Sequence, residues 1–293
     1  MKVLGTAILT RYPRTFTSIT FAAAVIFQSC GVAVAQPIYG PEQQIIDTLD
    51  NSLGQPASKD VELRLGAGPV ATFALDNGGR RKVYGLPLVF FRYKDYLSID
   101  ETQARLNVVP VDSSIGIAGF RAGPMVKVDF GRRAFASGVT GPGKVGTSIE
   151  VGGFVSYTVG VVRLRARVRH DVASGHNGSL AEFDFRTGLY RRGPFGLGLQ
   201  VSTAWASKDY MQSFFGVTPA QAIGSHLPVY SPRPGFKDVR GSLTAEYKFS
   251  EHWSSATSVQ YVRRIGDALH SPVVTLKGAA DRINTGVFAL YAF

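Results

Sequence analysis

The stretch VVRLRARVRHDV, residues 161–172, contains an arginine at every second position. A guanidinium group presents five N–H donors in a planar fork that fits carboxylate and phosphate groups. Such a run predicts either a basic patch for an anionic polymer such as a nucleic acid, or one charged face of a regular element. The four residues are Arg163, Arg165, Arg167 and Arg169.

The histidines give no metal-binding or catalytic pattern. None shows the H-x-x-x-H or H-x-H spacing that brings two ligands onto one metal ion. His170 and Asp171, with Ser174 and His176, resemble a hydrolase constellation, but adjacent residues of a strand point to opposite faces. The G-x-S-x-G turn that presents a nucleophilic serine is missing from the sequence. We therefore expect no catalytic residues, no metal, no cofactor and no enzymatic activity.

The spacing of the arginines indicates a strand. Residues two apart on a helix lie about 200° apart around its axis, which would scatter the arginines. On a strand all four share one face, and the intervening aliphatic residues share the other. The next predicted strand carries Glu182 and Asp184 on its polar face. A register with Arg169 opposite Glu182 and Arg167 opposite Asp184 would offset part of the positive charge, and would leave Arg163 and Arg165 less compensated.

The amino terminus predicts export. Residues 1–35 contain three basic residues and no acidic residue, then an apolar run, then Ala33-Val34-Ala35 before Gln36. This order is typical of a secretory signal peptide, so we expect cleavage after Ala35. Acylation of Cys30, the single cysteine, is the alternative, although the residues before it fit a lipoprotein signal poorly. The following residues, 36–60, form a polar segment.

The charge and hydropathy of the mature chain limit the environments in which it can function. The whole chain has 32 basic and 21 acidic residues, and removal of the signal leaves 29 against 21, a net charge of +8. Export argues against nucleic acid as the partner and favours anionic lipid or cell-wall polymer. No apolar run after Ala35 approaches the ~20 residues of a membrane-spanning helix. That excludes a helical membrane protein and leaves a β-barrel, whose strands alternate in polarity.

Residues 61–293 divide into evenly spaced segments rich in valine, threonine and aromatic residues, separated by turn residues. We predict strands at roughly 61–74, 82–94, 96–109, 118–131, 146–158, 162–172, 180–191, 195–208, 236–249, 252–265 and 282–293. Alternation alone also fits a soluble sandwich, but these segments have the length of tilted membrane strands. The fold predicted is all-β, a transmembrane antiparallel β-barrel of about 10–12 strands. Single-chain bacterial barrels have an even number of strands, so one of these eleven assignments is wrong, and a missed strand could lie in 209–235.

The predicted barrel implies which strand ends face the periplasm, which residues face the lumen and which residues close the barrel. Short turns near residues 159, 193 and 250 alternate with longer polar links, as in outer-membrane barrels with periplasmic turns and external loops. The chain ends in GVFALYAF, which resembles the insertion signal read by the outer-membrane assembly machinery, with Tyr291 and Phe293 as its aromatic residues. The residues predicted to face the lumen are Arg163, Arg165, Arg167, Arg169, Glu182 and Asp184.

The longest link, 209–235, contains two features. The run TPAQAI begins with a capping threonine and a proline at the first helical position, which predicts a single helical turn. Just before it, four apolar residues either bind a partner or pack the loop down as a plug. These are Tyr210, Met211, Phe214 and Phe215.

Several motifs resemble the MipA/OmpV family of outer-membrane proteins, named for a protein that interacts with the lytic transglycosylase MltA. They include ASKDYMQSFFGVTPAQAIGSHLPVYSPRPGFKDV, GDALHSPVV, EVGGFVSYTVGVVRLRARVRHDVASGHNG and LPLVFFRYKDYLSI, and the resemblance covers about residues 61–293. It implies a barrel in the outer membrane of a Gram-negative bacterium, in contact with lipid and lipopolysaccharide. The resemblance transfers no catalytic or cofactor residues. The segment DNGGRRKVYG replaces the family's acidic, aromatic early loop.

Two functions remain open at this point. The resemblance implies a non-enzymatic scaffold for a lytic transglycosylase and a penicillin-binding protein at the cell envelope. The basic strand face allows a second function, a small channel that admits anions through a charged lumen. Pairing of the lumen charges would favour a sealed barrel, and uncompensated arginines would favour conduction.

Overall fold

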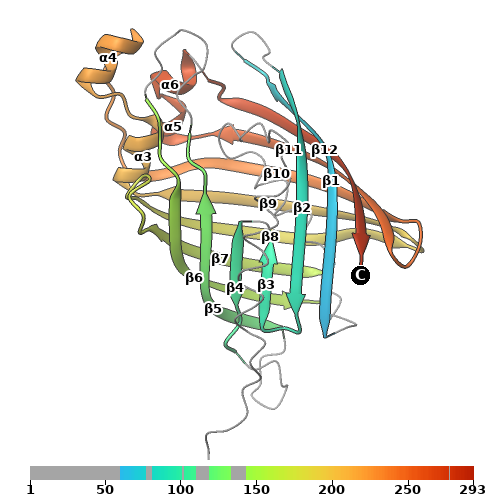
Figure 1. Cartoon of the computed structure of the whole chain (residues 1–293). Helices are drawn as coiled ribbons and strands as arrows, with labels where there is room; N and C mark the ends of the chain where they lie inside the picture. Colours follow the sequence, from blue (N-terminus) through green and yellow to red (C-terminus); the bar gives the residue numbers. More distant parts are fainter. Residues whose placement is uncertain (1–59, 77–80, 101, 110–118, 133–142, 277) are drawn as a thin grey trace, which may run out of the picture. The chain divides into compact units, whose positions relative to one another are not determined.

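The structure is a computed structural model that describes residues 60–76, 81–100, 102–109, 119–132, 143–276 and 278–293. Its twelve strands form a closed antiparallel barrel in chain order, in which β1 pairs with β12 (Figure 1). The strands are β1 (Val61–Ala74), β2 (Arg81–Tyr93), β3 (Leu97–Asp100), β4 (Gln103–Leu106), β5 (Phe120–Asp129), β6 (Ser148–Val159), β7 (Val162–Asp171), β8 (Ser179–Arg192), β9 (Phe195–Ala206), β10 (Gly235–Lys248), β11 (Trp253–Arg264) and β12 (Asp281–Ala292). The predicted fold class is confirmed.

One segment accounts for the odd strand count of the sequence prediction. The predicted strand 96–109 is two short strands, β3 and β4, which pair with each other with Leu97 opposite Leu106. The connecting residues contain neither glycine nor proline, the residues that usually mark a turn in sequence, so the break was missed. The prediction that 209–235 could hide the twelfth strand is wrong. That segment carries helices.

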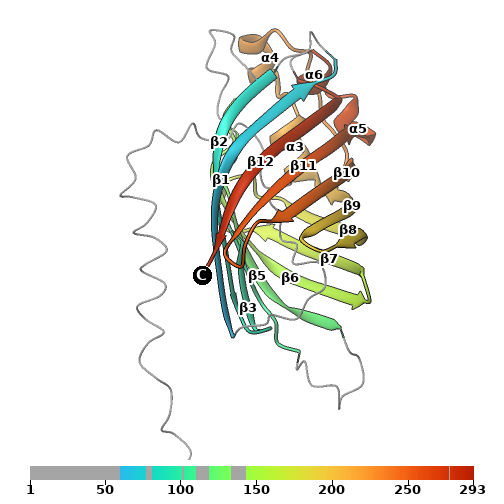
Figure 2. The ribbon, with the colours of Figure 1, turned by 90° about the vertical axis from the view of Figure 1, so that its right-hand side faces the viewer.

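In the described part of the chain, four short helices gather at the end of the barrel away from the carboxyl terminus (Figures 1 and 2). They are α3 (Lys208–Phe215), α4 (Pro219–Ser225), α5 (Gly266–Leu269) and α6 (Pro272–Thr275). The Thr218 hydroxyl accepts from the Gln221 N–H and the Gln221 side chain accepts from the Thr218 N–H, a capping box that starts α4 where a helical turn was expected. Among the described residues, no helix is both long and apolar enough to cross a membrane.

Alternation along each strand separates an apolar outer face from a polar inner face. On β7, Leu164 and Val168 are 52% and 59% exposed, whereas Arg167 between them is 2% exposed. The exposed outward side chains are apolar, so lipid is the solvent that suits them. On the opposite wall of the interior, an apolar cluster of residues from β1, β2, β11 and β12 is buried: Val70, Leu88, Phe90, Ala256, Phe288 and Leu290.

The two ends of the barrel differ in their connections. Gly160 and Gly193, in the left-handed region that tight turns require, lie between β6 and β7 and between β8 and β9. Aromatic pairs flank these short turns, including Tyr190 with Phe195 and Trp253 with Tyr291. Short turns with an aromatic girdle are typical of the periplasmic end of an outer-membrane barrel, which leaves the helical loops at the external end.

Candidate functional site

The inner face of β7 and β8 carries an extended ion-pair network. Arg165, Arg167 and Arg169 are all buried, as are Glu182 and Asp184. Arg163, nearer the short turn, is partly buried, and its Nε donates to the Thr158 hydroxyl at 3.2 Å. The structure therefore brings together on the barrel interior the six residues that the sequence assigns to a lumen.

The predicted register of β7 and β8 is wrong by two residues. Arg167 lies opposite Glu182, Arg165 lies opposite Asp184, and Arg169 lies opposite Leu180. The two expected ion pairs nevertheless form diagonally, with Arg169 Nη1 2.5 Å from Glu182 Oε2 and Arg167 Nη2 3.0 Å from Asp184 Oδ2. Arginine reaches a diagonal neighbour because such Cβ atoms lie about 7–8 Å apart.

The connection between β7 and β8 sets this register. The Asp171 carboxylate accepts hydrogen bonds from the backbone N–H groups of Ala173, His176 and Asn177, and the Asp171 N–H donates to the Gly178 carbonyl at 3.0 Å. These bonds fold the loop around one side chain. They pin residue 171 to residue 178, and every later pair on the two strands follows from that contact.

The network continues onto β6, which neighbours β7, and onto β10, which lies beyond β9. Arg169 Nε is 2.9 Å from Glu150 Oε2 on β6, and Arg240 Nη2 on β10 is 3.4 Å from Glu182 Oε1. Arg165 Nε is 3.1 Å from Asp184 Oδ2, so the expectation that Arg165 would be weakly compensated is wrong. A buried charge is tolerable when it is paired and hydrogen-bonded, and each of these arginines meets that condition.

A second group lies at the external end of β10 and β11. The Asp238 carboxylate is 2.7 Å from Lys237 Nζ, 2.7 Å from Arg264 Nη1 and 3.5 Å from Arg240 Nε. Our sequence prediction missed Glu150, Asp238, Arg240 and Arg264. Polar residues occupy alternate positions in segments 148–159, 235–248 and 253–264. This alternation could have identified them as inward-facing.

His176 connects the network to the external loops. Its Nε2 lies 3.1 Å from Glu150 Oε1, and its Nδ1 accepts from the Gly178 N–H at 3.0 Å. His170 is exposed, and its Nδ1 lies 3.0 Å from the Ser179 hydroxyl. Of the hydrolase-like group considered from sequence, Asp171 and His176 are in contact, with the His176 N–H donating to Asp171 Oδ2 at 2.7 Å, whereas His170 lies on the exposed side. In the described part of the chain, no group of three or more His, Cys, Asp or Glu residues could hold a metal ion.

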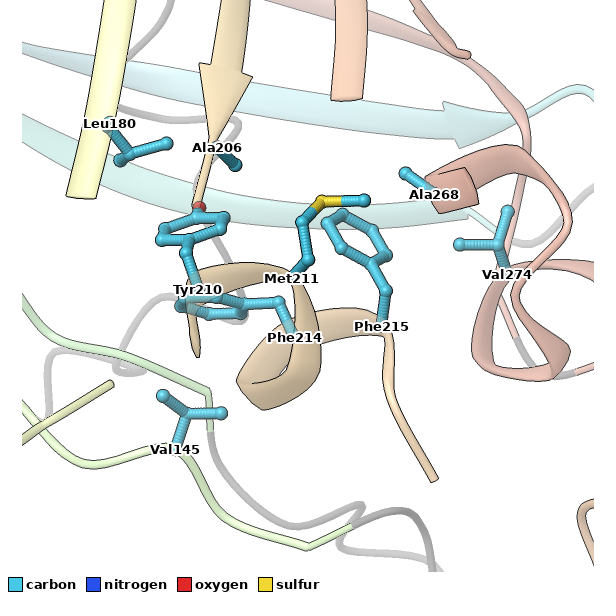
Figure 3. Packing of buried hydrophobic residues seen from close by; sticks show 9 residues of the cluster. All are labelled: Val145, Leu180, Ala206, Tyr210, Met211, Phe214, Phe215, Ala268 and Val274. Carbon is cyan, nitrogen blue, oxygen red and sulfur yellow. The ribbon is translucent and has the colours of Figure 1, made fainter. Parts of the chain in front are cut away.

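Helix α3 packs its apolar residues against the loops and strand ends at the helical end of the barrel. Tyr210, Met211, Phe214 and Phe215 are buried, and Figure 3 shows them packed with residues of β8, β9, α5 and α6. The Tyr210 ring contacts His176 edge-on at 4.9 Å between centroids. Arg132 donates to the Phe214 carbonyl at 2.7 Å, which ties the helix to the segment after β5. Of the two roles open for these residues, their burial supports the plug.

The segment that follows α4 is fastened to α5. The Tyr230 hydroxyl donates to the Asp267 carbonyl at 2.8 Å, and the Arg233 N–H donates to Asp267 Oδ2 at 2.8 Å. The Arg233 side chain also donates to this carboxylate, and these bonds hold the pKa of Asp267 below its ordinary value. Burial, together with the nearby Asp267 charge, raises the pKa of Tyr230.

Tyr291 and Phe293 lie on the outer face at the short-turn end. Their rings meet edge-on at 4.8 Å, and the Phe293 N–H donates to the Leu63 carbonyl on β1 at 3.0 Å. The last strand thus closes the barrel at its first strand. The use of these residues as an insertion signal stays a prediction, as does cleavage at Ala35, which lies outside the described residues together with residues 36–59.

Comparison with known proteins gives one family and a set of weakly similar barrels. The family model described as MltA-interacting protein MipA matches residues 65–293. No curated protein sequence matches the chain.

Among solved structures, the NanC porin is 10% identical with a TM-score of 0.42, covering 79% of this chain and 98% of the porin. An outer membrane channel from Pseudomonas putida F1 is 9% identical with a TM-score of 0.41, covering 83% and 99%. The translocator domain of the autotransporter NalP from Neisseria meningitidis is 11% identical with a TM-score of 0.39, covering 94% and 97%.

Proposed function

The chain belongs to the family of MltA-interacting protein MipA and is a β-barrel protein of the Gram-negative outer membrane, and from this premise we propose that it is a non-enzymatic scaffold. In this role the barrel holds a lytic transglycosylase and a penicillin-binding protein, one that cuts murein and one that synthesises it, close to the membrane. We take these two classes of partner enzyme from the family to which the chain belongs. Lipid and lipopolysaccharide surround its apolar outer face.

The observation that carries the proposal is the pairing of the interior charges. Arg165, Arg167 and Arg169 each lie within 3.1 Å of a carboxylate oxygen on a neighbouring strand. An anion channel needs basic groups that a passing anion can approach, whereas Arg167 and Arg169 are each only 2% exposed and bind fixed carboxylates. The α3 plug, anchored through Arg132, supports a barrel whose interior serves stability.

Affinity capture tests the scaffold. The purified barrel, immobilised in detergent, is exposed to an envelope extract, and bound lytic transglycosylase and penicillin-binding protein are identified by mass spectrometry. An unrelated outer-membrane barrel on the same resin is the control. We expect both enzymes on the sample resin and neither on the control. Retention of neither enzyme, together with steady anion-selective current in planar bilayers, would overturn the scaffold in favour of the channel.

A further inference from the structure

A basic hollow opens at the short-turn end of the barrel, apart from the plug. It has a volume of about 650 Å³, part of which is open solvent, and it is lined by residues from β2 through β7. Phe154 and Leu97 contribute apolar surface, and among the described residues of the lining Asp95 is the one acidic residue. Six cationic side chains line it: Arg92, Lys94, Arg105, Arg121, Arg163 and Arg165.

Strand register arranges four of these arginines in two matching rows. In the first row Ser98 on β3 lies between Arg92 on β2 and Arg105 on β4. In the second, Ser156 on β6 lies between Arg121 on β5 and Arg165 on β7. Neighbouring strands are about 4.8 Å apart, so the two arginines of a row start roughly 10 Å apart with a small hydroxyl between them. This spacing leaves room between the guanidinium groups.

Carboxylates beside the arginines hold the rows in place. Arg92 Nη1 is 3.6 Å from Glu62, Arg121 Nη2 is 2.8 Å from Asp95, and Arg165 Nε is 3.1 Å from Asp184. Arg105 pairs with Asp100. Of these four acids only Asp95 lines the hollow.

A guanidinium group has five N–H donors, more than one carboxylate accepts, so it can bind a fixed carboxylate and a ligand together. Pre-positioned arginines also lose little conformational entropy when an anion arrives. The acids therefore orient the arginines, and the lining itself keeps an excess of positive charge.

We propose that this hollow binds a small polyanion from the periplasm, one that carries two or more carboxylate or phosphate groups. Each Arg-Ser-Arg row receives one anionic group, and Phe154 and Leu97 contact the apolar part of the ligand. The site stands independently of the scaffold, because it rests on the lining residues alone.

The test measures binding of two probes to the folded full chain in detergent by titration calorimetry at constant ionic strength. Pyrophosphate and citrate distinguish phosphate from carboxylate ligands, and sucrose is the neutral control. We expect at least one anion to bind, more weakly as salt rises, and sucrose not to bind. The double variant Arg121→Gln with Arg163→Gln should weaken binding by roughly tenfold or more, because charge-assisted hydrogen bonds are lost.

The matched control is Arg233→Gln with Arg263→Gln, which removes the same charge from exposed positions at the other end of the barrel. It should leave the affinity unchanged. Absence of binding to the wild type, or equal loss in the two double variants, would overturn the site.

If the site variant does not fold, chemical modification of arginines in the wild type with phenylglyoxal tests the site instead. The better-binding probe should protect Arg121 and Arg163 and leave Arg263 reactive. Equal modification of all three with and without the probe would also overturn the site.

Discussion

Glu182 lies directly opposite Arg167 on the neighbouring strand, yet its shorter ion pair is with Arg169, one pleat away: 2.5 Å against 3.4 Å. Arg167 in turn lies 3.0 Å from Asp184. Asp184 joins two arginines and Glu182 joins three, so the pairs form a chain instead of separate bridges. Removal of one member consequently affects several charges at once.

Glu182→Gln should destabilise the barrel by about 3 kcal/mol, the low end of the range for breaking a buried ion pair. Its three arginines each keep a second carboxylate, which limits the loss. Urea unfolding in lipid vesicles measures the difference in unfolding free energy. Glu251→Gln, in an exposed turn, is the control and should change stability by no more than about 0.5 kcal/mol. Equal effects would contradict the network.

Leu164→Arg should cost about 2–4 kcal/mol, because the side chain lies on the lipid-facing side of β7. The same change at Val172, exposed just beyond the end of β7, should cost about 0–1 kcal/mol, because a guanidinium there reaches water. Folded yield in vesicles, read from heat-modifiable migration on gels, compares the two. A Val172→Arg variant as impaired as Leu164→Arg would refute the assignment of β7 to the membrane.

Replacing both Tyr291 and Phe293 by serine should abolish assembly into the outer membrane while export continues. The closing strand must be recognised before it can pair with β1. Cell fractionation should find the variant in the periplasm, degraded or aggregated. Phe249→Ser removes an exposed aromatic residue near a turn of the same end and should assemble normally. Folded double variant in the membrane would contradict the insertion signal.

Cleavage after Ala35 should leave Gln36 as the first residue of the mature protein, because small residues at positions 33 and 35 fit signal peptidase. Amino-terminal sequencing of protein purified from the outer membrane measures this directly. A mature chain that starts at a diacylated Cys30 would show that the lipoprotein alternative is correct.

The contact between Arg233 and Asp267 should weaken in acid. Hydrogen bonds from Arg233 lower the pKa of Asp267 in the folded chain, so the carboxylate stabilises the docked segment above its ordinary pKa of about 4. That stabilisation is lost as the pH falls through the lower, folded-state value. Acid-protease cleavage near residues 228–234 should therefore rise with falling pH. Asp267→Asn should show enhanced cleavage with no such pH dependence, and a pH response equal to that of the wild type would count against the contact.

The sequence by itself determined the barrel and the faces of its strands. Polar and apolar residues alternate with period two from Arg163 to Arg169. Only a strand of a closed sheet places the apolar residues against lipid and the polar residues in the interior. The alternation is a local property of the chain. The capped turn at Thr218 was predictable for the same reason, because its hydrogen bonds join residues three apart.

Only the tertiary structure decided how the charges pair. The register of β7 and β8 depends on how residues 172–178 fold around Asp171, and a shift of two residues keeps every side chain on its face, so alternation cannot detect it. Arg240 reaches Glu182 and Arg167 reaches Gln103, which lie 58 and 64 residues away in sequence. The basic hollow likewise forms only when strands β2 through β7 lie side by side in the barrel. No local sequence pattern predicts which of their residues come together.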